Sequence, residues 1–377
     1  MSDWKKGYLS DILLLTMGQS PVGQYCNTDG EGTPLLNGPT EFGIKSPKAV
    51  QFTTDPKKMS AAGDILFCVR GSTTGRMNWS DKPYAIGRGI AAFRHTHGDE
   101  YQHFLKGTID YQLPAILNSA TGSTFPNVSK DQLLNLEIGI PPLPEQKAIA
   151  SILAGLDDKI DLLHGQNRTL EALTETLFRQ WFIEEALENW EQGVLPDEFE
   201  FTMGQSPPGS SFNEAQIGTP MFQGNADFGF RFPTERVFTT DPRRFAEELD
   251  TLISVRAPVG AQNMALKGCC IGRGVAAFKS IYSGDFYTYT YYKLRSLMSK
   301  IQQFNDEGTV FGSIGKKDFQ KIVVTIPPNT LVQSFENEVK PLNDKIINNC
   351  KEIRTLELLR DTLLPKLISG KIKVGAS

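Results

Sequence analysis

The stretch Met17-Gly18-Gln19-Ser20-Pro21 decides the fold, because it occurs twice in this chain. It returns as Met203-Gly204-Gln205-Ser206-Pro207, 186 positions later. Phe52-Thr53-Thr54-Asp55-Pro56 returns with the same offset as Phe238-Thr239-Thr240-Asp241-Pro242. Self-similarity at a fixed period indicates a chain built from copies of one structural unit. Two copies of 186 residues fill nearly all of the 377 residues.

A third repeated motif has the letters of a dinucleotide-binding loop. Ile86-Gly87-Arg88-Gly89 recurs at Ile271-Gly272-Arg273-Gly274, one position out of step with the other motifs. Together with residues 90–92 it spells G-x-G-x-x-A, which binds dinucleotides only where a helix begins inside the glycines. Residues 90–93 instead have the pattern of a strand, so we expect no nucleotide cofactor.

Each copy begins with a part that is rich in glycine, proline, threonine and phenylalanine. Short apolar runs such as 65–69 and 90–93 lie between turn residues, which is typical of strands in a compact, loop-rich domain. Helix is expected only at 99–117 and at 129–136, where the Ser129 hydroxyl can cap the second helix.

Each copy ends with a long helical pattern. Apolar residues recur at intervals of three, four and seven, as in the seam of a coiled coil. The predicted seam consists of Ile149, Ile152, Leu156, Leu163, Leu170, Leu173 and Leu177 in the first copy, and Leu342, Ile346, Ile353, Leu356, Leu363 and Leu367 in the second. From Glu145 to Phe182 the first helix would be roughly 55 Å long at 1.5 Å per residue.

The sequence therefore predicts an α+β protein with a pseudo-twofold internal repeat. Two similar β-rich mixed domains, residues 1–142 and 188–328, would be separated by two long antiparallel coiled-coil helices, residues 143–187 and 329–377. The helices should pack on each other, because an isolated one would leave its apolar stripe in water.

Charge and composition limit the function. The net charge is −4, which at first sight argues against a nucleic-acid partner, because lysine and arginine carry backbone binding. Most of the acidity lies in residues 143–187, so a β-rich domain can still present a basic face. No apolar run approaches the roughly 20 residues that span a membrane, and residues 1–7 lack a signal-peptide pattern, so we expect a cytoplasmic protein.

Neither a metal site nor a disulfide framework is predicted. Five cysteines show no C-x-x-C spacing, which favours reduced thiols. His95, His97 and His103 lie near Asp99 and Glu100. No further cysteine or histidine pair completes a ligand set, so we interpret this cluster as a polar surface loop.

Several segments, in order and in both copies, resemble the specificity subunits of type I restriction-modification systems. The segments that carry this resemblance are Ile140-Pro141-Pro142-Leu143-Pro144-Glu145-Gln146 with Leu156-Asp157-Asp158-Lys159-Ile160, Gly63-Asp64-Ile65-Leu66 with Arg70-Gly71, their counterpart Ser254-Val255-Arg256-Ala257-Pro258-Val259-Gly260, and the tail Leu364–Ile372. The second copy departs from the pattern at 329–333, which lacks the Pro-Glu pair of the first.

The resemblance implies target recognition domains that each read one half of a split DNA sequence. It implies that the helices act as a spacer and as a docking surface for methyltransferase subunits, two per chain, and that restriction subunits join the complex. Half-sites one turn apart are separated by about 34–36 Å, a span that helices of this length can bridge. The chain itself would have no catalytic activity.

Candidate phosphate contacts are basic residues that both copies share. Arg70 and Arg256 follow equivalent strand-like runs, and Arg88 and Arg273 lie between glycines. Residues common to two domains that read different half-sites would contact phosphate. Lys130, Lys316 and Lys317, at the start of a short predicted helix, are further candidates. The alternatives are scaffold arginines and a solvated helix face.

Base-reading residues are expected where the copies diverge. When the copies are aligned, Asn37 and Thr40 correspond to Gln223 and Ala226, and Asn225 lies between those two. Ser72, Thr73, Thr74 and Arg76 correspond to Pro258, Val259, Gly260 and Gln262. Asparagine, glutamine and arginine pair bidentately with adenine or guanine edges. The candidates are Asn37, Thr40, Ser72, Thr73, Arg76, Gln223 and Asn225. Ordinary divergence between loops would explain the differences as well.

Trp181 and Phe182, near the end of the first helix, are candidates for partner docking. Asp157, Asp158 and Asp161 form a carboxylate cluster that we interpret as a solvated helix face, with docking as the alternative.

Two other classes of protein remain as alternatives. An amino-methyltransferase would show an Asn- or Asp-Pro-Pro-aromatic loop, and a nuclease would show converging carboxylates with a lysine; neither pattern is found, nor is a Walker loop. A structural spacer with two similar heads is the other alternative, and salt-dependent DNA binding would distinguish it.

Overall fold

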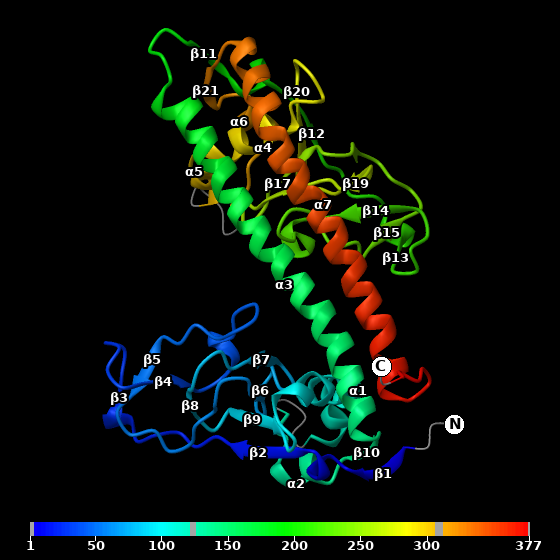
Figure 1. Ribbon diagram of the computed structural model, residues 1–377. Coiled ribbons are helices and arrows are strands. Elements are labelled where there is room, and N and C mark those ends of the chain that lie inside the picture. Colours follow the sequence, from blue (N-terminus) through cyan, green and yellow to red (C-terminus); the bar gives the residue numbers. More distant parts are fainter. Residues whose placement is uncertain (1–3, 121–125, 306–311, 376–377) are drawn as a thin grey trace. The chain divides into compact units, whose positions relative to one another are not determined.

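The computed structural model describes residues 4–120, 126–305 and 312–375, and its contacts divide the chain into two compact units (Figure 1). The first unit comprises Met1–Leu162 with Arg354–Ser377, and the second comprises Leu163–Ile353. Strands and helices follow in nearly the same order in both units, so the sequence repeat is a repeat of structure.

The first unit contains three small sheets. Its elements are β1 (Lys5–Tyr8), β2 (Leu13–Met17), β3 (Cys26–Asn27), β4 (Thr33–Leu36), β5 (Gln51–Thr53), β6 (Ile65–Cys68), β7 (Met77–Trp79), β8 (Ala85–Ile86), β9 (Ile90–His95), α1 (Gln102–Ser119), α2 (Lys130–Leu134) and β10 (Glu137–Ile140). The strand orders are β2-β9-β6-β7, β3-β5-β4-β8 and β1-β10. All pairs are antiparallel except β4 with β8, which run parallel with Leu36 opposite Ile86.

The second unit repeats this topology. Its elements are β11 (Glu191–Val194), β12 (Phe199–Met203), β13 (Phe212–Asn213), β14 (Thr219–Phe222), β15 (Phe238–Thr239), β16 (Phe245–Ala246), β17 (Thr251–Ser254), β18 (Gln262–Met264), β19 (Cys269–Ile271), β20 (Val275–Ser280), α4 (Tyr287–Ser296), α5 (Met298–Gln302), α6 (Lys316–Phe319) and β21 (Val323–Ile326). The orders are β12-β20-β17-β18, β13-β15-β14-β19-β16 and β11-β21. The parallel pair is again present, with Phe222 opposite Ile271.

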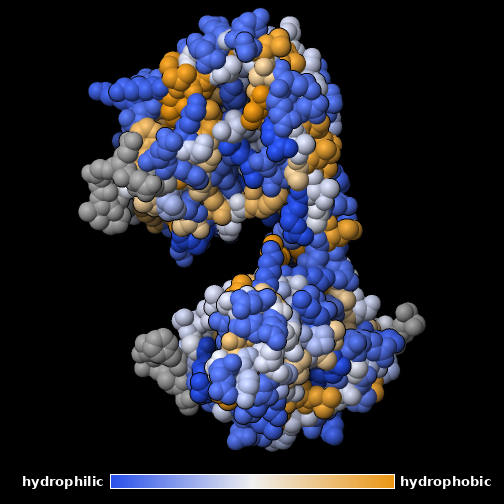
Figure 2. All heavy atoms as spheres, turned by 90° about the vertical axis from the view of Figure 1, so that its left-hand side faces the viewer, coloured by the Kyte–Doolittle hydropathy of each residue, from blue (hydrophilic) through white to orange (hydrophobic). Residues whose placement is uncertain are grey.

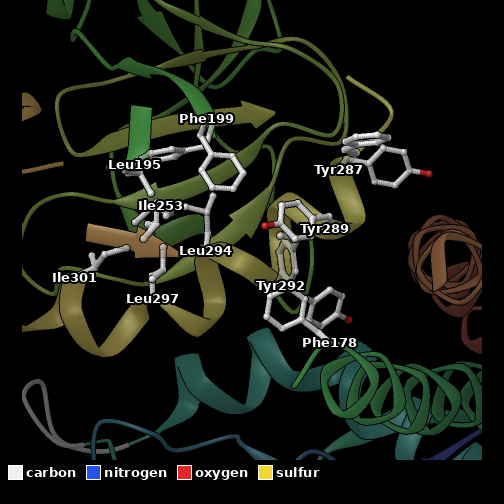
Figure 3. Packing of buried hydrophobic residues seen from close by; sticks show 14 of the residues in the cluster. Phe178, Leu195, Phe199, Ile253, Tyr287, Tyr289, Tyr292, Leu294, Leu297 and Ile301 are labelled. Atoms are coloured by element: carbon white, nitrogen blue, oxygen red, sulfur yellow. The ribbon is translucent and has the colours of Figure 1, made fainter. Parts of the chain in front are cut away.

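In each unit a helix packs on the larger antiparallel sheet. In the first, Phe67 on β6 stacks on Phe93 of β9 with ring centroids 5.1 Å apart, and Phe104 of α1 lies in the same core. In the second, Phe199 and Ile253 of the sheet lie in one core with Tyr289 and Leu294 of α4 (Figure 3). Fully burying a side chain of this size contributes about 1.5–3 kcal/mol, so these contacts fix the sheet that carries the loops described below.

Two long helices, α3 (Leu143–Arg179) and α7 (Asn329–Ile368), confirm the predicted helical segments. They run antiparallel within each unit. In the first, Arg360 Nη1 donates to Asp157 Oδ1 at 3.1 Å; in the second, Asn349 Nδ2 donates to Asn167 Oδ1 at 2.9 Å. The predicted fold class, two similar β-rich mixed domains with two long antiparallel helices, is confirmed.

The predicted seam is partly wrong. Ile149 and Leu163 are buried, but Ile152 and Leu173 are 36% and 45% exposed. Polar residues occupy much of the buried stripe, namely Gln146, Asn167 and Thr174 on α3 and Glu336, Asn343 and Asn349 on α7. A pattern of apolar residues alone could not find these positions.

A proline lies inside α7. Pro341 comes twelve residues after Asn329, the first residue of the helix. Its exposed side chain faces away from the core.

The shorter helices agree with the sequence apart from their ends. α1 begins at Gln102, after a 3-10 turn over Asp99–Tyr101. α2 is shorter than predicted, but Ser129 caps it as expected: its Oγ accepts from Gln132 N at 3.2 Å, and Gln132 Oε1 accepts from Ser129 N.

Candidate nucleic-acid interface

The repeated motifs meet in each unit. Gly18 N and Gln19 N of the first Met-Gly-Gln-Ser-Pro turn donate to the carbonyls of Ile90 and Ile86, which flank the Gly-Arg-Gly turn. A Cβ at Gly18 would lie 2.1 Å from the carbonyl oxygen of Gly87, so only glycine permits this approach.

The second unit has the same arrangement. Gly204 N and Gln205 N donate to Val275 O and Ile271 O. A Cβ at Gly204 would lie 2.1 Å from Gly272 O. The letters that recur in the sequence therefore build one junction of two turns in each unit.

The Gly-Arg-Gly turn leads directly into a strand. β9 begins at Ile90 and β20 at Val275, so the prediction of an extended segment is confirmed. The residues that follow the glycines form a strand and not the start of a helix, so the turn lacks the geometry of a dinucleotide loop. It presents Arg88 and Arg273 to solvent instead.

The serines of the Met-Gly-Gln-Ser-Pro motif accept hydrogen bonds from these arginines. Arg88 N donates to Ser20 Oγ at 3.2 Å. Arg273 donates to Ser206 Oγ through both its main-chain N and its Nε, at 3.2 and 3.3 Å.

A third loop joins the same junction. Residues 37 and 223 leave the parallel pairs β4/β8 and β14/β19, and both side chains are exposed. Asn37 Nδ2 donates to Gln51 Oε1 at 2.9 Å, whereas Gln223 Oε1 accepts from Ser206 Oγ at 3.1 Å. Sequence reasoning missed these two supports. Because the serine recurs in both copies, the sequence could have indicated a role for Ser206. Gln51 corresponds to Val237 in the other copy, so the sequence gave no indication of its role.

The loop after β6 brings Arg70 to the same place. Val69 N donates to Gly89 O, and Arg70 Nε donates to Asn127 Oδ1 at 3.1 Å. Arg70 forms a β-bridge with Asn127. Asn127 lies three residues before Lys130, the first residue of α2, so the start of this helix adjoins the loop. In the second unit Val255 N donates to Gly274 O, and Arg256 forms a bridge with Ser313, close to Lys316 and Lys317 on α6.

The two units differ most in the turn that follows these arginines. Gly75 N donates to Cys68 O, and Gly260 N donates to Ser254 O. The turn in the second unit is therefore one residue shorter than the turn in the first. Our pairing of Arg76 with Gln262 is therefore wrong: Arg76 O accepts from Cys68 N as Ala261 O accepts from Ser254 N. The deletion also explains the one-position slip of the Gly-Arg-Gly motif.

Side chains around this turn face different surroundings. Arg76 Nη1 lies 3.5 Å from Pro39 O, which brings this guanidinium to the loop that carries Asn37 and Thr40. Ser72 and Thr40 are exposed, while Thr73 is half-buried with its Oγ1 3.7 Å from Cys68 Sγ. Asn225 is half-buried at the start of a 3-10 turn, where its carbonyl accepts from Phe228 N.

The basic candidates of both units share one property. All are exposed, and none forms an ion pair with a carboxylate in residues 4–120, 126–305 or 312–375. They are Arg70, Arg76, Arg88, Lys130, Arg256, Arg273, Lys316 and Lys317. Some other exposed cations are paired, as Arg243 is with Asp241 at 2.6 Å, whereas Lys48 and Lys58 are exposed and also lack an ion pair within the described residues. Arginine and lysine side chains without an ion pair can bind phosphate oxygens without first breaking a salt bridge. The face of each unit drawn in Figure 2 is largely hydrophilic.

The two aromatic docking candidates are not equally accessible. Phe182 is buried, with its ring 4.9 Å from Phe178 and 5.0 Å from Phe335, so it is a core residue. Trp181 is half-buried and lines a surface hollow of about 440 Å³ together with Trp190 and Leu331.

The acidic and histidine clusters have structural roles. Asp161 pairs with Lys45 at 2.6 Å, and the side-chain bond to Asp161 raises the pKa of Lys45. Asp157 pairs with Arg360. Our interpretation of these carboxylates as a solvated face is wrong for Asp157 and Asp161, since internal cations hold them.

The histidine cluster is likewise not a surface loop throughout. His95 is buried at the end of β9, and its Nε2 lies 3.0 Å from Gln146 Oε1. Burial lowers its pKa to about 4. His97 is exposed, and His103 packs against Trp79 with ring centroids 4.8 Å apart. The five cysteines, all of which lie in the described ranges, form no disulfide, as predicted. No helix within the described ranges has an apolar stretch long enough to cross a bilayer.

Comparison with known proteins agrees with the motifs. Residues 1–172 match the family described as type I restriction modification DNA specificity domain. Two specificity subunits of type I restriction enzymes from Methanocaldococcus jannaschii are similar to the chain. MjaX is 35% identical over 264 residues, which are 66% of this chain and 62% of the relative; MjaIX is 28% identical over 284 residues, 67% and 64%. The chain thus spans less than two thirds of either relative.

A solved structure shares the fold of nearly the whole chain. The S subunit of a type I restriction-modification system from M. genitalium superposes with a TM-score of 0.65 at 21% identity, and covers 97% of this chain and 96% of that one. The resemblance seen in the sequence is confirmed.

Proposed function

Because residues 1–172 carry a type I restriction modification DNA specificity domain, we propose that this chain is the DNA sequence-recognition subunit of a type I restriction-modification complex. Residues 1–142 and 188–328 each read one half of a bipartite, asymmetric DNA site. Residues 143–187 and 329–377 form the spacer. The observation that carries the proposal is that the same junction of loops, with unpaired cations around it, is built in both units.

Two sets of residues divide the work of binding. Cations that occupy equivalent places in both units bind phosphate and position the protein, because backbone contacts carry no sequence information. Residues that differ between the units, among them Asn37, Thr40, Ser72, Thr73 and Arg76 in the first and Gln223 and Asn225 in the second, read bases.

The chain supplies no reaction of its own and acts through partners. Two methyltransferase subunits dock on each chain, and restriction subunits join them on double-stranded DNA. Trp181, with the hollow beside it, is the aromatic docking candidate that solvent can reach. Phe182 lies in the core, where its ring is 6.4 Å from that of Trp190, another residue that lines the hollow.

Exchange of one domain tests this function. We expect that replacing residues 1–142 with the same region of another specificity subunit changes one half of the DNA motif and leaves the other half unchanged. Selection of bound duplexes from a random pool measures this. A change in both halves would contradict independent reading by the two domains. If DNA binding by the unaltered chain did not depend on salt, a protein-binding spacer would be favoured instead.

A further inference from the structure

One position in each unit combines an identical backbone setting with a different side chain. Gly87 N donates to Leu36 O at 2.8 Å, and Gly272 N donates to Phe222 O at 2.9 Å. The next residues along the chain are Asn37 and Gln223. A Cβ at Gly89 would lie 2.4 Å from Asn37 O, and one at Gly274 would lie 2.2 Å from Gln223 O. Both residues are thus seated against the last glycine of the Gly-Arg-Gly turn.

Each of these exposed amides is held by one hydrogen bond, at opposite ends of the group. Asn37 is held through Nδ2 by Gln51 Oε1, which leaves its Oδ1 and its second N–H free of that bond. Gln223 is held through Oε1 by Ser206 Oγ, which leaves its Nε2 hydrogens and a second lone pair. A side chain fixed in this way loses less rotamer entropy when it binds.

Asn37 keeps one N–H and Gln223 keeps two, each beside an amide oxygen that can still accept; the Oδ1 of Asn37 lies against Gly87, where a Cβ would be 2.2 Å from it. In the major groove, adenine presents an acceptor, N7, beside a donor, the N6 amino group. Guanine presents two acceptors there, cytosine a donor and thymine an acceptor. The free hydrogen-bonding groups of both amides therefore match adenine better than any other base.

The neighbouring residues support a reading position rather than a scaffold position. Arg88 and Arg273 extend from the same turn, are exposed, and are identical in the two units. They can bind the phosphates beside the base without distinguishing one sequence from another. What differs at this junction is the amide and the residue that holds it.

We propose that Asn37 and Gln223 each read one adenine, one in each half of the DNA site, and that Gln51 and Ser206 orient them for it. This inference rests on the proposed function. It adds the base that is read, the residue that reads it in each domain, and the residues that position the two amides.

The test is selection of duplexes from a random pool by the full chain, with wild type, Asn37→Asp and Gln223→Glu. These substitutions preserve side-chain shape but remove the N–H that adenine N7 requires, and a carboxylate accepts from the cytosine amino group. We expect the first variant to lose one adenine from one half-site, with at least about tenfold weaker discrimination there and a shift towards cytosine. The second variant should do the same in the other half-site only.

Each variant is the control for the other, because the unaltered half of the motif shows that the chain is folded and bound. Asn37→Ala and Gln223→Ala should lose the adenine without the gain of cytosine. If the wild type selects a bipartite motif and Asn37→Asp leaves every position unchanged, the inference is overturned while the proposed function stands. If the wild type selects no motif, the proposed function itself is contradicted, and the inference with it.

Discussion

Asn349 donates a hydrogen bond of 2.9 Å to Asn167, and both side chains are buried between α3 and α7 in the second unit. Asn167 also donates to Cys350 Sγ at 3.4 Å. In the sequence repeat the counterparts of the two asparagines are Leu163 and Ile353, which are apolar and buried. The repeat therefore relates the polar pair Asn167 and Asn349 to the apolar pair Leu163 and Ile353, and each pair takes one residue from each copy.

Loss of this polar pair should destabilise the second unit. Asn349→Ala removes the donor to Asn167 Oδ1, and a buried unsatisfied polar group costs about 1–3 kcal/mol. Asn348→Ala, at the exposed neighbouring position on the same helix, should change the free energy of unfolding by less than about 0.5 kcal/mol. Urea titration of both variants measures the difference, and equal stabilities would show that the polar pair contributes nothing.

Two adjacent leucines on α3 should behave oppositely. Leu163 is 1% exposed and Leu162 is 55% exposed. Leu163→Asp places a carboxylate in the seam and should lower the free energy of unfolding by about 3 kcal/mol or more. Leu162→Asp should be nearly neutral. Thermal unfolding compares the two variants, and a stable Leu163→Asp chain would contradict the described packing.

The exposed arginines of the two turns should control affinity without controlling sequence. Arg88→Ala and Arg273→Ala should each weaken binding to every duplex and lower the slope of log K against log salt by about 0.9. Arg243→Ala, which removes an exposed arginine already paired with Asp241, is the matched control and should change neither quantity. Fluorescence anisotropy across a salt series reports both, and a change of preferred sequence would assign these arginines to base reading instead.

Acid should destabilise the first unit through His95. Burial lowers its folded pKa to about 4, below the unfolded value of about 6.5. As the pH falls, the unfolded chain therefore binds the proton first. The contribution of neutral His95 to the free energy of unfolding is present above pH 6.5 and is lost as the pH falls towards 4. Its size is about 3 kcal/mol.

Substitution tests the assignment of this pH dependence. His95→Gln should flatten the slope of stability against pH in this window, whatever it does to stability at neutral pH. His97→Gln, at an exposed position, should retain the slope. Denaturant midpoints between pH 4 and 7 provide the measurement, and an unchanged slope in His95→Gln would refute the assignment.

Repetition in the sequence predicted the architecture because each motif is part of one junction. Gly18 and Gly204 recur since a Cβ at either would clash with the facing turn. The strands and the capped helix α2 followed from local patterns, which depend on neighbours within a few residues.

What the sequence could not predict depends on contacts between distant residues. Asn167 and Thr174 are polar and yet buried, because partners on α7 or their own backbone satisfy them. The slip of the Gly-Arg-Gly motif showed that the second copy lacks one residue, but the hydrogen bonds of the turn after Arg256 were needed to locate the deletion. Gln51 supports Asn37 from the neighbouring strand, and its counterpart is Val237, so comparison of the copies gave no signal for it.

The most direct measurement of the central claim is a genome-wide map of methylated adenines in cells that express this chain together with a methyltransferase subunit of a type I restriction-modification system. The account predicts one two-part motif with a fixed unread gap, which disappears when this chain is deleted and the methyltransferase is kept. A motif that survives the deletion, or methylation without any two-part motif, would contradict it.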